Sequence, residues 1–212
     1  LGYRGDVIKN YFLQYDECVS NNFVLSKGGK DIQLLSSDID EWKITFVDTG
    51  LHSNLGQRLK AVEPYLDDGD DLFMANYSDG LTDLHLPTYL NYFRRRDATA
   101  SFLCVHPTYS FHVVQADDGG RVRSVRSADD ASLWINGGVF IFRRNIFDVV
   151  KPGDELVDAP FRRLIEQDRL LAYKYTGFWA CMDTFKDKQT FDDMYARGET
   201  PWAVWDAPGR DG

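Results

Sequence analysis

Residues 71–77 (DLFMANY) form an almost continuous apolar run that is flanked on both sides by Asp-Gly pairs. A run of this length without polar alternation is typical of a strand buried on both faces of a sheet. Helical spacing of apolar residues in 6–17 and 57–66 alternates with extended patterns in 32–35 and 42–47. This alternation predicts an α/β fold with parallel strands.

Extended patterns dominate the chain after a helix expected at 87–96. The strands expected there are 98–105, 111–115, 122–125, 133–142 and 170–175, and the later helices are 146–150, 160–167 and 184–197. We find no internal repeat and no linker, so the simplest organisation is a single domain over residues 1–212. Because the chain opens at Leu1 without an initiator Met, we expect an upstream part of the fold to be absent.

The charge and hydrophobicity of the chain argue against two classes of binding partner. The chain has 33 acidic and 24 basic residues and a net charge of −9, whereas a duplex-binding surface needs concentrated positive charge. No window approaches the roughly 18 apolar residues of a membrane span, so we expect neither nucleic acid polymer nor membrane as partner. The cysteines Cys18, Cys104 and Cys181 are odd in number and lack metal-type spacing, which predicts free thiols in the cytoplasm.

The tetrapeptide 77–80 (YSDG) places a carboxylate where the buried strand ends and a glycine lets the chain turn. Ligands of open α/β sheets bind beyond the carboxyl ends of strands, and an aspartate there can hold Mg²⁺ together with substrate phosphates. The alternative is that Asp79 and Gly80 form only a turn. From these residues alone the two interpretations are equally supported.

Residues 177–184 (GFWACMDT) contain a second carboxylate, Asp183, next to an aromatic stretch. Asp183 or Thr184 can cap the helix that follows, since both residue types are strong N-caps. A carboxylate beside aromatic rings also suits a metal or sugar site. From this segment alone the capping interpretation is favoured.

Two glycine-containing segments are further candidates. Gly137 and Gly138 interrupt an apolar strand, which indicates either close approach of a ligand or a β-bulge, and the amide of Asn136 can both donate to and accept from sugar hydroxyls. Residues 54–60 (NLGQRLK) form a loop that enters a helix, where backbone N–H groups can face an anion. The histidines, His106 included, show no ligand spacing and are interpreted as structural or surface residues.

Taken in chain order, these segments resemble the glucose-1-phosphate cytidylyltransferase family of the sugar nucleotidyltransferases. The resembling pieces extend over nearly the whole chain and include 47–50 (VDTG), 56–60 (GQRLK), 78–80 (SDG), 135–138 (INGG), 177–179 (GFW) and 182–184 (MDT). The resemblance implies a Rossmann-like mixed, mostly parallel sheet flanked by helices, with a small β-rich portion. It also implies an enzyme that commonly forms homo-oligomers and joins a nucleoside triphosphate to a sugar 1-phosphate with release of pyrophosphate. CTP and glucose 1-phosphate are the default substrates.

The resemblance also implies the site residues. Asp79 and Asp183 would be the catalytic residues and would hold Mg²⁺. The nucleotide would lie against Gly56, Gln57, Arg58, Ser78 and Gly80. The sugar would lie against Asn136, Gly137, Gly138, Gly177, Phe178 and Trp179. Because the sugar phosphate attacks the α-phosphorus in line, positioning and charge neutralisation would carry catalysis.

Three departures from the family pattern affect these expectations. The family's N-terminal Gly-rich loop, which cradles the triphosphate, has no counterpart here, and turnover should collapse without it. A family lysine that faces the sugar phosphate is replaced in 127–130 (SADD), near Ala128, by acidic residues, and the turn at 110–112 (SFH) lacks the family's glycine. These departures support an alternative, a non-catalytic nucleotide- or sugar-phosphate-binding relative that regulates or assembles with an active partner.

The tail after residue 201 carries Trp202 and Trp205. Exposed tryptophans tend to mark contact surfaces, so this tail can dock on a neighbouring subunit. The alternative is that it folds back on its own domain.

Overall fold

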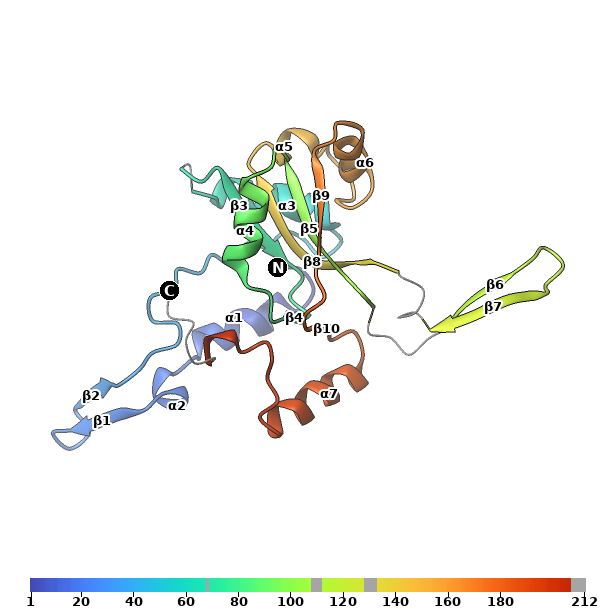
Figure 1. Cartoon of the computed structure of the whole chain (residues 1–212). Coiled ribbons are helices and arrows are strands. Elements are labelled where there is room, and N and C mark those ends of the chain that lie inside the picture. Colours follow the sequence, from blue (N-terminus) through green and yellow to red (C-terminus); the bar gives the residue numbers. More distant parts are fainter. Residues whose placement is uncertain (68, 108–111, 128–132, 207–212) are drawn as a thin grey trace. The chain divides into compact units, whose positions relative to one another are not determined.

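The computed structural model describes residues 1–67, 69–107, 112–127 and 133–206. The backbone divides into two compact units, which we call unit 1 (1–68 with 150–159) and unit 2 (69–149 with 160–212). Figure 1 labels the helices and strands of both. Because compact units can belong to one domain, the single-domain organisation stays a prediction.

Unit 2 is built on a four-stranded mixed sheet with the strand order β3-β8-β5-β9. Its strands are β3 (Leu72–Asn76), β8 (Ile135–Arg143), β5 (Ala100–Val105) and β9 (Leu170–Lys174). Strand β8 runs antiparallel to both β3 and β5, whereas β5 and β9 are parallel. Three strands therefore share one direction and β8 opposes them, which confirms the mixed sheet; because β8 lies between β3 and β5, only the β5–β9 pairing is parallel.

Helices cover both faces of this sheet because side chains alternate along its strands. The covering helices are α4 (Leu86–Arg94), α5 (Ile146–Val149) and α6 (Ala159–Glu166), and unit 2 also contains α7 (Phe185–Ala196). Tyr89 and Phe93 of α4 are fully buried in a cluster with Leu103 of β5. On the opposite face Phe102 stacks on Phe161 of α6, with 5.7 Å between ring centroids. Burial of each such ring contributes about 1.5–3 kcal/mol, so both layers are held by apolar packing.

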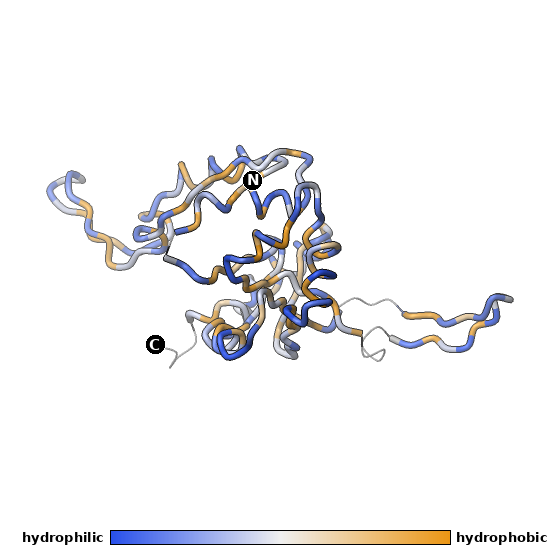
Figure 2. Tube along the Cα trace, turned by 90° about the horizontal axis from the view of Figure 1, so that it is seen from above, coloured by the Kyte–Doolittle hydropathy of each residue, from blue (hydrophilic) through white to orange (hydrophobic). Residues whose placement is uncertain are grey.

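Two short antiparallel pairs complete unit 2. Strand β4 (Gly80–Thr82) pairs with β10 (Trp179–Cys181), and β6 (His112–Ala116) pairs with β7 (Val122–Ser127). The turn between β6 and β7 is hydrophilic (Figure 2) and is tied by an ion pair of 2.7 Å between Arg123 and Asp117. These pairs are the small β-rich portion that the sequence predicts.

Unit 1 contains three helices, one short 3₁₀ segment and a hairpin. These are α1 (Gly5–Leu13), α2 (Glu17–Ser20), β1 (Phe23–Ser26), β2 (Asp31–Leu34), α3 (Leu55–Val62) and η1 (Glu63–Tyr65). The strand predicted at 42–47 is wrong, since none of these residues enters a strand. The apolar pattern of this segment serves side-chain packing instead, with Phe46 5.5 Å from Phe12 of α1 between ring centroids.

A β-bulge interrupts the pairing of β5 with β8 between Phe102 and Cys104. The extra residues on β8 include Gly138, whose φ of +72° lies in the left-handed region that side chains rarely adopt. A Cβ built there would lie 2.5 Å from Cδ2 of Tyr77, too close for any real contact. The backbone of Tyr77 also donates a hydrogen bond to O of Gly138 at 2.8 Å. The bulge that the two glycines predicted is therefore present, and Tyr77 occupies the space above it.

We expect Gly138→Ala to lower the free energy of unfolding by about 2–4 kcal/mol, because left-handed strain and a clash with Tyr77 act together. The matched control is Gly120→Ala, which has a φ of +79° but nothing within 4 Å of the added methyl group. That variant should lose only about 1 kcal/mol. Urea denaturation of both variants provides the measurement, and equal losses would contradict the packing account.

Candidate active site

Antiparallel pairing of β4 with β10 places Asp79 and Asp183 at the same end of this two-stranded ladder. Gly80 lies opposite Cys181, and N–H of Met182 donates to O of Asp79 at 2.8 Å. Asp79 directly precedes β4 and Asp183 follows Met182 by one residue. Because the strands run in opposite directions, two carboxylates separated by more than 100 residues meet.

The two carboxylates line one cleft of about 340 Å³ within unit 2. Its lining residues are Tyr77, Asp79, Gly80, Ile135, Asn136, Gly137, Trp179, Cys181 and Asp183. Both aspartates are exposed, whereas the indole of Trp179 is buried. The cleft therefore presents acidic side chains to solvent above an apolar base. Of the predicted site residues, it brings together Asp79, Gly80, Asn136, Gly137, Trp179 and Asp183.

Thr184 caps helix α7, so the cap that the sequence allowed for Asp183 is assigned to its neighbour. Oγ1 of Thr184 accepts from N–H of Asp187 at 3.2 Å, and the Asp187 carboxylate accepts from N–H of Thr184 at 2.8 Å. This reciprocal arrangement satisfies two donors of the helix start. Asp183 stands one residue before the cap, where its carboxylate accepts from Sγ of Cys181 at 3.1 Å and lines the cleft.

Asn136 presents a donor to the cleft. Its Oδ1 accepts a hydrogen bond from N–H of Gly138 at 2.9 Å, which fixes the orientation of the amide. No hydrogen bond of its NH₂ group occurs in the part of the chain that the structure describes. The amide can therefore donate to a ligand oxygen.

Gly137 and Trp179 form the base of the cleft. The indole N–H of Trp179 donates to O of Gly137 at 2.8 Å in a buried bond. A Cβ on Gly137 would lie 3.1 Å from Val105 and 3.2 Å from the same indole. Packing against Val105 and Trp179 thus explains why residue 137 is a glycine. Packing against Tyr77 explains in the same way why residue 138 is a glycine.

Contacts with Tyr175 and with Thr82 fix the turn that contains Gly177 and Phe178. The hydroxyl of Tyr175 donates to the carboxylate of Asp83, and a Cβ on Gly177 would lie 2.3 Å from that hydroxyl. O of Phe178 accepts from Oγ1 of Thr82 at 2.8 Å. These contacts fix the segment that leads into Trp179.

Trp202 folds back on its own unit. Its ring lies 5.8 Å from that of Phe178 and 5.4 Å from that of Phe191, between centroids. Trp205 remains 75% exposed. Of the two arrangements open for the tail, Trp202 therefore takes the intramolecular one.

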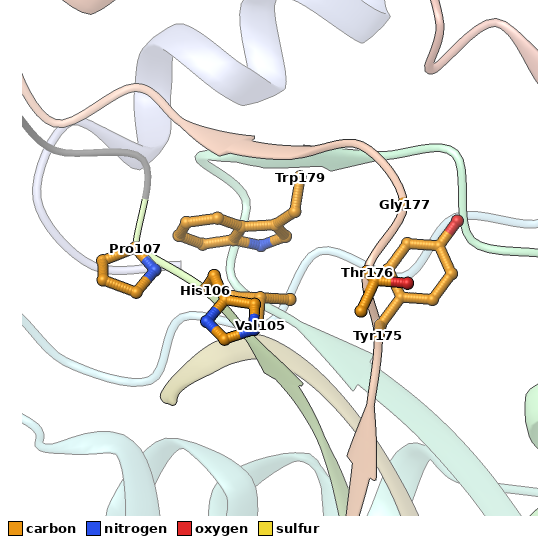
Figure 3. A pocket seen from close by; sticks show the side chains of 7 residues that line it. All are labelled: Val105, His106, Pro107, Tyr175, Thr176, Gly177 and Trp179. Atoms are coloured by element: carbon orange, nitrogen blue, oxygen red, sulfur yellow. The ribbon is translucent and has the colours of Figure 1, made fainter. Parts of the chain in front are cut away.

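A second cavity of about 370 Å³ shares Trp179 with the carboxylate cleft. Figure 3 shows the His106 ring beside Val105 and below the indole of Trp179, with Tyr175 and Thr176 farther along the cavity. Sequence reasoning missed His106 because it looked for ligand spacing between histidines. Its position directly after the buried strand β5 was the available signal.

Burial raises the pKa of the Cys104 thiol. Register places Cys104 opposite Asn136, but a buried thiol with a raised pKa stays protonated and is a poor nucleophile. The structure records Cys18, Cys104 and Cys181 as free thiols, as predicted. Among the described residues no group of three or more His, Cys, Asp or Glu side chains could hold a metal ion, so any metal here would rely on the aspartate pair.

The three nucleotide-binding residues predicted in unit 1 have local structural roles. Gln57 forms a capping box with Asn54 at the start of α3. Arg58 donates to Oγ1 of Thr49 at 2.8 Å, and a Cβ on Gly56 would lie 2.2 Å from O of Asp154. Their approach to a nucleotide stays a prediction, as does that of Ser78, which lies in the exposed turn before Asp79.

The family departures at 110–112 and 127–130 fall largely outside the described residues. The side chains that replace the family lysine near Ala128 lie in that part of the chain. Searching the described helices for a bilayer-crossing segment finds none of sufficient length and apolarity.

We expect Trp179→Phe to lower the free energy of unfolding by about 1–3 kcal/mol, because it removes a buried hydrogen bond and leaves O of Gly137 without a donor. Trp205→Phe makes the same chemical change at an exposed position and should stay within about 0.5 kcal/mol of the unmodified chain. Chemical denaturation followed by circular dichroism measures both. Similar losses in the two variants would show that the indole does not anchor β10.

No family model matches the chain. A Bacillus subtilis protein named as a glucose-1-phosphate cytidylyltransferase is 31% identical over 208 residues, covering 97% of this chain and 80% of that protein. The glucose-1-phosphate cytidylyltransferase of Salmonella typhi is 30% identical over 208 residues, covering 97% of this chain and 79% of its own length.

A solved structure supports the fold alone. A Bacillus anthracis protein described as a glucose-1-phosphate thymidylyltransferase, crystallised with sucrose, superposes with a TM-score of 0.50 at 13% identity. The match covers 71% of this chain and 65% of that one. The Bacillus subtilis and Salmonella typhi relatives, at 31% and 30% identity, match 97% of this chain. The chain therefore belongs to the glucose-1-phosphate cytidylyltransferase family of sugar-1-phosphate nucleotidyltransferases.

Proposed function

We propose that this chain joins CTP to glucose 1-phosphate with release of pyrophosphate, and that Asp79 and Asp183 hold the Mg²⁺ required. The observation that carries the proposal is the meeting of these two carboxylates with Asn136 in one cleft. The choice of CTP and glucose 1-phosphate rests on the names of the relatives that share about 30% of the sequence.

The residues present fit a magnesium ion. Mg²⁺ is bound in proteins by one or two carboxylates and completes its shell with water and substrate phosphate oxygens. Asp79 and Asp183 supply two exposed carboxylates on a rigid strand pair, which leaves room for a triphosphate. When bound, the ion would offset negative charge on the phosphates.

The protein's own groups position the reactants. An oxygen of the sugar phosphate forms a bond to the α-phosphorus, and the bond from that phosphorus to the oxygen that bridges the α- and β-phosphates breaks, with pyrophosphate leaving. The amide of Asn136 is oriented to donate to a sugar hydroxyl. The turn through Gly177 and Phe178 offers a fixed wall for the sugar ring. Holding two reactants in line accounts for much of the acceleration in reactions of this kind.

Two further parts of the proposal concern the assembly and the location of the chain. Helix α1 buries none of its residues and leaves Val7, Tyr11 and Leu13 exposed, an apolar surface of the kind that subunit contacts cover. We therefore propose that the chain forms a homo-oligomer. Free thiols at all three cysteines support a cytoplasmic location.

Pyrophosphate release tests the proposed reaction. With the full-length protein, Mg²⁺, CTP and glucose 1-phosphate we expect activity that falls by at least about 100-fold in Asp79→Asn and in Asp183→Asn, because each loses a charged ligand at the developing charge. The control is Asp118→Asn in the exposed β6–β7 turn, which should keep full activity. UTP and dTTP are tested in parallel for base choice.

Two results would count against the proposal. Activity in both aspartate variants equal to that of the unmodified chain would remove the metal assignment. Absence of pyrophosphate release with every nucleotide, in a folded chain that still binds one, would support the non-catalytic binding relative instead.

A further inference from the structure

A cluster of cationic and aromatic side chains lies at the ends of strands β5, β8 and β9. The ring of His106 lies 3.9 Å from that of Trp134 between centroids. Nζ of Lys174 lies 5.0 Å from the centroid of the same indole, and the face of an indole attracts a cation. Two side chains that can carry positive charge therefore meet on one ring.

The hydrogen bonding of His106 leaves one ring nitrogen for a ligand. Nδ1 lies 3.0 Å from O of Leu133, and because a carbonyl oxygen only accepts, Nδ1 carries the hydrogen. No hydrogen bond of Nε2 occurs among the residues that the structure describes. Nε2 is a donor in the doubly protonated form of histidine, which is the form that can donate to an anion.

Among the described residues, no carboxylate forms an ion pair with Lys174, and the one recorded contact of its ammonium group is with the ring of Trp134. Strand register places Lys174 beside Cys104 of β5, and the neighbour of Cys104 on β8 is Asn136. Asn136 lines the carboxylate cleft, so Lys174 lies in register with a cleft residue, two strands away in the sheet.

We propose that Lys174 and His106 bind the phosphate group of the sugar 1-phosphate, an inference that rests on the proposed function because it assigns one substrate of that reaction. His106 lines the cavity of about 370 Å³ that shares Trp179 with the carboxylate cleft. Pockets of this size hold small organic ligands. A phosphate monoester carries up to two negative charges and several strong acceptor oxygens, which suit two convergent cationic donors.

The positions of His106 and Lys174 set the orientation of the substrate. His106 lines the cavity that shares Trp179 with the carboxylate cleft, and Lys174 contacts the ring of Trp134 against which His106 lies. With the phosphate at these two side chains, the sugar ring lies toward the fixed turn at Gly177, which lines the same cavity as His106.

Binding measurements test this site without needing turnover. Isothermal titration calorimetry compares glucose 1-phosphate, glucose and inorganic phosphate as probes of the whole chain. We expect Lys174→Met to weaken glucose 1-phosphate binding by roughly 10- to 100-fold, because a charge-assisted hydrogen bond is lost, while glucose binding stays unchanged. Lys174→Arg should stay within about threefold because the charge is kept. His106→Asn, which can retain the donor toward Leu133, should also weaken glucose 1-phosphate selectively.

The control is Lys30→Met, which removes the same charge from an exposed position in the β1–β2 turn and should bind all three probes normally. Glucose 1-phosphate binding in Lys174→Met equal to that of the unmodified chain would overturn the inference. A parallel loss of glucose binding would also overturn it, since that would indicate a structural role. Binding of inorganic phosphate without glucose 1-phosphate would replace it with a free-phosphate site.

Failure of this inference is separable from failure of the proposed reaction. If Lys174→Met raises the KM for glucose 1-phosphate and leaves that for CTP unchanged, both stand. If the chain binds glucose 1-phosphate through Lys174 but releases no pyrophosphate with any nucleotide, the phosphate site stands and the reaction does not. If pyrophosphate is released and Lys174→Met has unchanged kinetics, only the phosphate site fails.

Discussion

The antiparallel pairing of β4 with β10 is the contact on which the candidate site depends, because it brings the segment around residue 79 to the segment around residue 183. A two-stranded pair with three residues on each side is barely stable by itself. Its stability comes from Trp179, which is buried in the core of unit 2 and hydrogen-bonded to Gly137 of the main sheet. The position of both aspartates therefore follows from the burial of one indole.

The residues that pack the site lie below its surface, and the residues that can bind a ligand lie at its surface. Below the surface, the glycines of β8 leave space that Tyr77 and Trp179 fill, so the base of the cleft is rigid. At the surface, Asp79 and Asp183 are exposed and available to ligands. A rigid base under exposed polar groups is the arrangement that positions reactants at low entropic cost. The cations at His106 and Lys174 extend the same edge of the sheet with the opposite charge.

How much the sequence predicts depends on whether a feature is local. The run at 71–77 became strand β3 because its apolar residues carry the signal by themselves, and the aspartate after it was correctly placed at a strand end. The strand predicted at 42–47 failed because an apolar pattern does not reveal whether a partner strand exists. The cluster of His106 with Trp134 and Lys174 was missed because register between strands far apart in sequence creates it. The residue types alone do not reveal which residues of these distant strands lie opposite one another.

Titration with Mn²⁺, followed by electron paramagnetic resonance, tests most directly whether the two aspartates form one metal site. Mn²⁺ shares the preference of Mg²⁺ for carboxylate and water oxygens. In the presence of CTP, the account predicts one tightly bound ion per chain and its loss when either Asp79 or Asp183 is changed to Asn. Unchanged Mn²⁺ binding in both single variants would show that the carboxylates meet in the cleft without holding a metal, and would contradict the central claim.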